Sequence, residues 1–230
     1  MADGRHASRS PRIKPATLII GGVVALIAVV IAVLLLGGGD SLPGIIGPDP
    51  LQTPEFAFET AKVIAVPTRP DAKDGELDSK ATRVAAEVED TMDALYIGAF
   101  LDPANWQEGA YDDVWELFES GAGDEAQAQV DTLTAGTGAG DAFDEIQPTL
   151  GTLQMKVLFD QKDRAFSTVA IVRFGARGKS KDGPDVRISS EGQFVFQQVD
   201  GAWKVVSFRV LRDDRLVEAS PSASASGSPS

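Results

Sequence analysis

Residues 186–210 read VRISSEGQFVFQQVDGAWKVVSFRV, and this stretch decides the fold. Phe194 and Phe196 share one phase of a two-residue period, which is typical of a strand with one buried face. The dipeptide Asp200-Gly201 favours a two-residue hairpin turn. The strand pattern resumes after the turn at Trp203, Val205, Val206, Phe208 and Val210. The stretch therefore predicts a β-hairpin, with Trp203 in the core.

Two further strands are predicted before this hairpin. The first alternating run has its apolar residues at Leu153, Met155, Val157 and Phe159. In the second, Phe166, Thr168, Ala170, Val172 and Phe174 alternate with Ser167, Val169, Ile171 and Arg173. Asp182-Gly183-Pro184 is a turn signal ahead of the hairpin. The chain after Pro148 therefore predicts four meandering antiparallel strands.

An amphipathic helix is predicted ahead of the strands. Its apolar residues recur at three- and four-residue steps, at Ala81, Val84, Ala85, Val88, Met92, Leu95, Tyr96 and Ala99. Asp78 or Ser79 can cap its start, and Asp102-Pro103 ends it. Helices followed by an antiparallel sheet predict an α+β fold.

Two shorter helices are predicted between the long helix and the strands. One runs from Tyr111 to about Glu119, with apolar residues on both of its turns. The other runs from Asp124 to Ala135, and the glycine-rich stretch at 136–140 ends it.

An uninterrupted apolar run lies near the N-terminus. From Leu18 to Leu36 there are 19 residues without a charged or strongly polar side chain. As a helix they would span roughly 28 Å, close to the hydrocarbon thickness of a bilayer. We therefore expect a transmembrane anchor at 17–39. A cleaved signal peptide is the alternative, because Gly37 and Gly39 imitate a small-x-small cleavage site.

The charge around this run predicts its orientation. Four basic residues lie in the tail 1–16, and none follows the anchor until Lys62. This asymmetry places the tail in the cytoplasm and the rest of the chain outside. Small residues that would share one face of the anchor are Gly21, Ala25, Ala28 and Ala32. Such a face permits close helix packing, as in a homodimer, although small residues are frequent in membrane helices anyway.

The segments before and after the expected domain at 78–219 are interpreted as a spacer and a tail. Residues 40–77 form a Pro/Gly-rich juxtamembrane spacer, in which EFAFETAKVIAV at 55–66 predicts a short strand that Pro67 ends. Residues 220–230, SPSASASGSPS, have no large apolar side chain, so a disordered tail is expected. Residues 78–219 remain as the extracytoplasmic domain.

Composition excludes several classes of function. The chain has 34 acidic and 21 basic residues and a formal net charge of −13, which argues against a nucleic-acid binder. Residues 78–145 hold most of the excess acid, and we interpret them as a solvated face because they lack a calcium-loop pattern. There is no cysteine, and the single histidine, His6, lies in the N-terminal tail. We expect neither a metal nor a cofactor.

Two segments carry a resemblance to a known superfamily. YDDVWELF at 111–118 and VDGAWKVVSFRV at 199–210, behind an amphipathic helix, resemble the NTF2-like, cystatin-like cone. The resemblance covers about residues 78–215. It implies about three helices packed on a curved antiparallel sheet of four or more strands, with a pocket at the wide end. A single anchor before such a domain also resembles actinobacterial envelope proteins, including Mce-associated membrane proteins.

The resemblance suggests one kind of catalysis. Members similar to ketosteroid isomerase use a pocket Asp as base and a Tyr hydroxyl to stabilise the oxyanion. Asp93 with Tyr96, or Tyr111 with Asp112, would supply these groups. Neither pair falls on a family motif position, so no role is carried over. A dehydratase-like reaction would need a pocket histidine, which residues 78–219 lack.

Other residues suggest binding. Trp106 and Trp115 would be core residues or would line a pocket. A basic loop near a strand end, either solvated or facing an acidic partner or lipid head groups, is predicted at Arg173, Arg177, Lys179 and Lys181. The leading hypothesis is a membrane-tethered, non-catalytic module that assembles with envelope proteins or holds an apolar small molecule. The alternative is an isomerase or lyase with an Asp/Tyr pair in the cone pocket.

Overall fold

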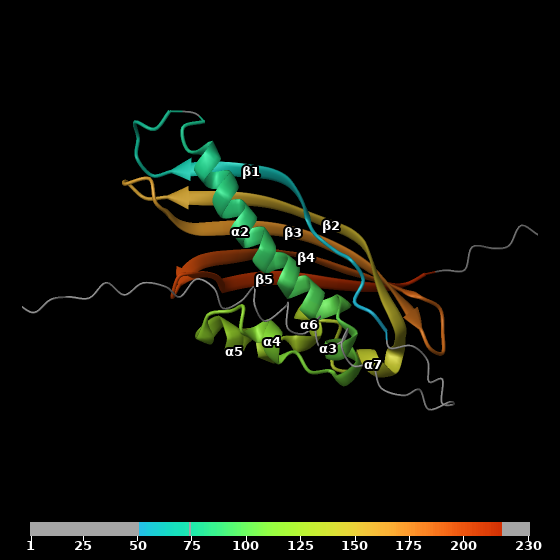
Figure 1. The fold of residues 1–230 in the computed structure, drawn as a ribbon. Helices are drawn as coiled ribbons and strands as arrows, with labels where there is room; N and C mark the ends of the chain where they lie inside the picture. The colour runs from blue at the N-terminus through green and yellow to red at the C-terminus, as the bar shows by residue number, and fades with distance from the viewer. Residues whose placement is uncertain (1–50, 74, 218–230) are drawn as a thin grey trace, which may run out of the picture. The chain divides into compact units, whose positions relative to one another are not determined.

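A computed structural model describes residues 51–73 and 75–217. A five-stranded sheet in the order β1-β2-β3-β4-β5 forms one layer, and helices pack on one of its faces (Figure 1). The α+β class is confirmed. The expected tail 1–16, the anchor 17–39 with Gly21, Ala25, Ala28 and Ala32, and the tail 220–230 lie outside the described residues. No helix within the described ranges is both long and apolar enough to cross a membrane.

Four of the strands form the predicted antiparallel meander. Their bounds are β2 Phe143–Phe159, β3 Ala165–Ser180, β4 Val186–Val199 and β5 Ala202–Leu216. Alternate side chains, such as Val172, Phe174, Phe194 and Phe196, are buried beneath the helices. Strand β2 begins before Pro148, earlier than predicted, because its first residues pair with the end of β3.

The strand expected within the spacer is β1, Glu59–Pro67. It pairs in parallel with β2, from Glu59 opposite Thr152 to Pro67 opposite Phe159. The folded unit therefore includes residues that the sequence analysis assigned to the spacer. A parallel pair needs a long crossover connection, and the chain between β1 and β2 supplies it with all the described helices.

Helix α2, Asp78–Tyr96, is the predicted amphipathic helix and lies across the sheet (Figure 1). Its buried residues follow the predicted stripe, at Ala81, Ala85, Val88, Met92, Leu95 and Tyr96. The predicted cap is wrong: Leu77 is the N-cap, and it makes no side-chain capping bond. Asp78 lies in the first turn instead, where its charge complements the helix dipole. A π-helical turn, η1 (Ile97–Leu101), continues the helix.

The shorter helices differ from the prediction. They are α3 Pro103–Glu108, α4 Asp112–Trp115, α5 Ser120–Ala128, α6 Val130–Leu133 and α7 Ala139–Ala142. The expected helix at 111–119 is only one turn, because Phe118 forms a bridge with Val205 of β5. Asp102-Pro103, interpreted as a helix end, also begins α3: the Asp102 side chain accepts a hydrogen bond from the Ala104 N–H, and Pro103 occupies the first turn.

Candidate functional site

Asp93 and Tyr96, the first candidate pair, have separate partners. The Asp93 carboxylate accepts a hydrogen bond from the backbone N–H of Phe58 at 2.8 Å. The Tyr96 hydroxyl lies 3.1 Å from Ser190 Oγ on β4. Burial raises the pKa of Asp93, and the bond from Phe58 opposes this shift. The carboxylate is therefore held by the backbone of the segment before β1, whereas the tyrosine hydroxyl is held by β4.

The ring of Tyr96 fills the space between α2 and the sheet. Its centroid lies 5.1 Å from that of Phe58, 5.4 Å from Phe100 and 5.0 Å from Phe174. The side chain is fully buried, and burial raises the pKa of its hydroxyl far above the usual value. Aromatic side chains therefore occupy the interior around Tyr96, where an isomerase would need room for its substrate.

Tyr111 and Asp112, the second candidate pair, point to different environments. Tyr111 is buried and donates its hydroxyl to the carbonyl oxygen of Gly136 at 2.9 Å. Asp112 is exposed in the first turn of α4. Burial raises the pKa of Tyr111. The pair therefore consists of a buried tyrosine bonded to the backbone and a carboxylate exposed to solvent.

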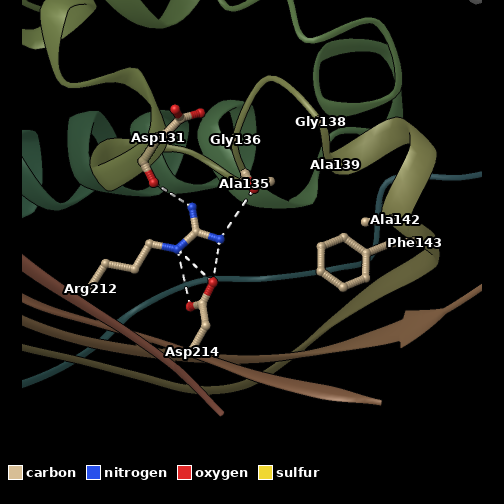
Figure 2. Close-up of a pocket in the computed structure, with 9 residues that line it drawn as sticks. All are labelled: Asp131, Ala135, Gly136, Gly138, Ala139, Ala142, Phe143, Arg212 and Asp214. Atoms are coloured by element: carbon tan, nitrogen blue, oxygen red, sulfur yellow. Dashed lines mark hydrogen bonds and ion pairs between the residues drawn. The ribbon is translucent and has the colours of Figure 1, made fainter. Parts of the chain in front are cut away.

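A shallow hollow of about 490 Å³ lies beside Arg212, between β5 and the turns around α6 and α7 (Figure 2). Its lining residues are Asp131, Ala135, Gly136, Gly138, Ala139, Ala142, Phe143, Arg212 and Asp214. Arg212 donates hydrogen bonds to the carbonyl oxygens of Asp131, Thr134 and Ala135 and to the Asp214 carboxylate. Its side chain is only 14% exposed.

The polar groups of this hollow are already engaged. The Arg212 guanidinium bonds three backbone carbonyls and one carboxylate, so its donors are not available to a bound anion. The Asp131 side chain accepts from the backbone N–H and the hydroxyl of Thr137. Arg212 thus clamps the turn after α6 to the sheet. The polar groups around the hollow are bonded to one another and to the backbone, so they hold the fold together.

A second hollow, of about 350 Å³, lies where the first described residues pass over α3 and the start of β2. Trp106 lines it, together with Leu51, Pro54 and Ile146. The Trp106 ring is buried, and its Nε1 has no hydrogen-bond partner within the described part of the chain. Trp106 is therefore both a core residue and a wall of a hollow. Trp115 is half-buried.

The prediction that the basic residues form a loop is wrong, because three of the four lie on a strand. Arg173, Arg177 and Lys179 lie on β3, on the face of the sheet opposite the helices, and Lys181 follows the strand. Arg177 pairs with Asp185 at 2.7 Å, and Lys181 Nζ donates to the Gly140 carbonyl at 2.6 Å. The alternation of β3 simply continues past the glycines that suggested a loop.

Metal-binding geometry and similarity to known proteins are two further sources of information about function. Among the described residues, no group of three or more acidic or histidine side chains is arranged to hold a metal ion. Comparison with family models, with curated proteins and with solved structures finds no match.

Sequence reasoning missed Arg212 and Ser190. Each lies in the inward phase of its strand after apolar residues of the same phase: Ser190 follows Ile188, and Arg212 follows Phe208 and Val210. A polar residue in the buried phase of a strand must find a partner, because an unpaired buried group costs free energy. This signal was present in the sequence, although the partners other than Asp214 come from distant segments.

Proposed function

We propose that this chain is a non-catalytic module of the cell envelope, tethered by residues 17–39, whose NTF2-like extracytoplasmic domain assembles with other envelope proteins. The tether is supported by the length of the apolar run and by the basic residues before it. The NTF2-like character is supported by a long helix that lies across an antiparallel meander.

One observation carries the non-catalytic part of the proposal. The Tyr96 hydroxyl, the best-placed oxyanion donor, is bonded to Ser190 and surrounded by aromatic rings. A proton-transfer enzyme needs its base and its donor to converge on a space that the substrate can enter. Asp93 and Tyr96 are each bonded to a separate partner, the Phe58 N–H and Ser190, which supports a structural role for both. The same packing favours assembly over storage of an apolar ligand.

Complementation of a strain that lacks the gene tests this proposal. Asp93→Asn, Tyr96→Phe and Asp112→Asn should each restore the wild-type phenotype at matched abundance, because none of these groups does chemistry. Deletion of residues 1–39 should abolish complementation, because the module would leave the membrane. Capture from crosslinked cells should then recover envelope proteins with the full chain and not with the deletion variant.

Two results would contradict the proposal. Loss of function in Asp93→Asn or Tyr96→Phe, with the protein folded, would favour the isomerase or lyase alternative. A mature N-terminus at or near Asp40 in purified protein would show that the apolar run is a signal peptide.

Reporter fusions active only outside the cytoplasm should work at Ser230 and fail at Met1.

A further inference from the structure

The face of the sheet opposite the helices is uncovered in the described part of the chain. Its side chains lie in rungs that cross neighbouring strands, as the register shows. We call it the outer sheet face, and the five rungs at its centre are Ile64-Lys156-Val169-Val195-Ser207, Lys62-Gln154-Ile171-Gln193-Arg209, Glu59-Thr152-Arg173-Glu191-Leu211, Leu150-Gly175-Ser189-Asp213 and Gln147-Arg177-Arg187-Arg215.

The charge of the outer sheet face is opposite to that of the whole chain. The five rungs carry seven basic side chains against three acidic ones, in a chain of net charge −13. Among the described residues, Lys62, Lys156, Arg187 and Arg209 form no ion pair. Residues 78–142, which form the helical layer on the other face, carry 15 acidic and 2 basic residues. The folded unit is therefore polarised across its sheet.

The chemistry of the outer sheet face suits a lipid surface better than a protein partner. Exposed aliphatic side chains stand among the basic ones: Leu211 is 69% exposed, Leu150 50% and Ile171 40%. The five rungs contain no aromatic side chain, whereas protein interfaces are enriched in Tyr, Trp and Phe and depleted in Lys. Basic residues spread over a broad surface, with aliphatic residues between them, are attracted to anionic head groups without requiring a defined pocket.

We propose that the outer sheet face lies against the anionic surface of the membrane. This inference rests on the proposed function for the tether, which holds the domain close to the bilayer. Attraction of the basic face and repulsion of the acidic helical layer both favour the same orientation, with the sheet toward the lipid and α2 away from it. The helical layer is then left facing the partner proteins.

The absence of cysteine makes the orientation directly measurable. The full chain, carrying Gln193→Cys on the outer sheet face or Ala86→Cys on the exposed side of α2, is labelled with a fluorophore and reconstituted into vesicles. The vesicles contain phosphatidylcholine alone or mixed with phosphatidylglycerol, with a spin-labelled head group as quencher. We expect quenching of the label at position 193 only with phosphatidylglycerol, reduced by high salt, and no quenching of the label at position 86.

Matched variants test the charge. Lys62→Gln and Arg209→Gln change the two ends of the rung that contains the labelled position, and each should lower the ratio of docked to undocked protein about fivefold. Lys80→Gln and Arg83→Gln remove the same charge from exposed positions of α2 and should leave the ratio unchanged. Circular dichroism spectra identical to wild type show that the variants remain folded.

Several outcomes would overturn the inference. These are equal quenching in both lipids, no quenching in either, stronger quenching at position 86, or an equal effect of the α2 variants. Capture of an acidic protein on this face without lipid quenching would replace the membrane with that partner. Failure of the tether has a separate readout, because the chain would then wash off the vesicles at alkaline pH. Quenching is in that case measured with the full chain added to preformed vesicles.

Discussion

The indole N–H of Trp203 donates a hydrogen bond to Glu87 Oε2 at 2.9 Å, joining β5 to α2 across 116 positions of sequence. Trp203 is buried, as the hairpin sequence predicted, and Glu87 lies on the exposed side of α2. The tryptophan therefore packs its ring in the core and places its only donor at the boundary with solvent.

Replacement of Trp203 should destabilise the fold strongly. Trp203→Ala leaves a large cavity, and we expect a loss of about 3–5 kcal/mol in the free energy of unfolding. Glu87→Ala removes only the hydrogen-bond acceptor and should cost about 1 kcal/mol. Asp90→Ala, at a position of the same helix outside its buried stripe, is the control and should stay within about 0.5 kcal/mol of wild type. Urea denaturation measures all three, and equal values for Trp203→Ala and Asp90→Ala would contradict the burial.

The β4–β5 turn should depend on backbone conformation. Asp200 and Gly201 have φ of 53° and 85°, in the left-handed region, and a Cβ at Gly201 would meet no atom within 4 Å. Gly201→Val should therefore destabilise through strain alone, by about 1–2 kcal/mol. Gly183 has the same open surroundings without a left-handed φ, so Gly183→Val is the matched control. Thermal melting that ranks the two variants equally would disprove the turn geometry.

The Arg212 clamp should stabilise the turn after α6. Arg212→Met leaves the carbonyls of Thr134 and Ala135 without their guanidinium donor, and we expect a loss of about 2–3 kcal/mol. Hydrogen exchange of the Ala135 amide, which donates to Ala99, should become faster. Arg215→Met, at an exposed ion pair on the same strand, should change stability by about 0.5 kcal/mol or less. Unchanged exchange at Ala135 would show that the clamp is not needed.

Asp93 should make the fold less stable as pH rises. Its pKa in the folded chain lies above the usual 3.8, mainly because of burial, so the folded state holds the proton more tightly than the unfolded state. Unfolding free energy should therefore fall as pH rises from 3.8 through the raised pKa. Asp93→Asn keeps an acceptor for the Phe58 N–H and should lack this decline. Denaturation at a series of pH values measures it, and parallel curves would contradict the shift.

Local signals predicted most of the sheet and the long helix. The alternation in β3, β4 and β5 and the stripe of α2 depend on residues two to four positions apart. The short helices were predicted poorly because each is one or two turns and is held by contacts outside itself, such as the bond from the Glu119 N–H to the Val205 carbonyl. The parallel pairing of β1 with β2 also had no local signal.

The sequence by itself determined the hairpin at Asp200-Gly201, the buried stripe of α2 and the exclusion of cysteine chemistry and of histidine chemistry in residues 78–219. These follow from the chemistry of single residues and from backbone preferences between near neighbours. Only the tertiary structure decided that Tyr96 meets Ser190, 94 positions away, and that Arg212 meets Thr134. It also gathered seven basic residues from all the strands on one face, because strand register, which sets those neighbours, depends on how the whole sheet packs.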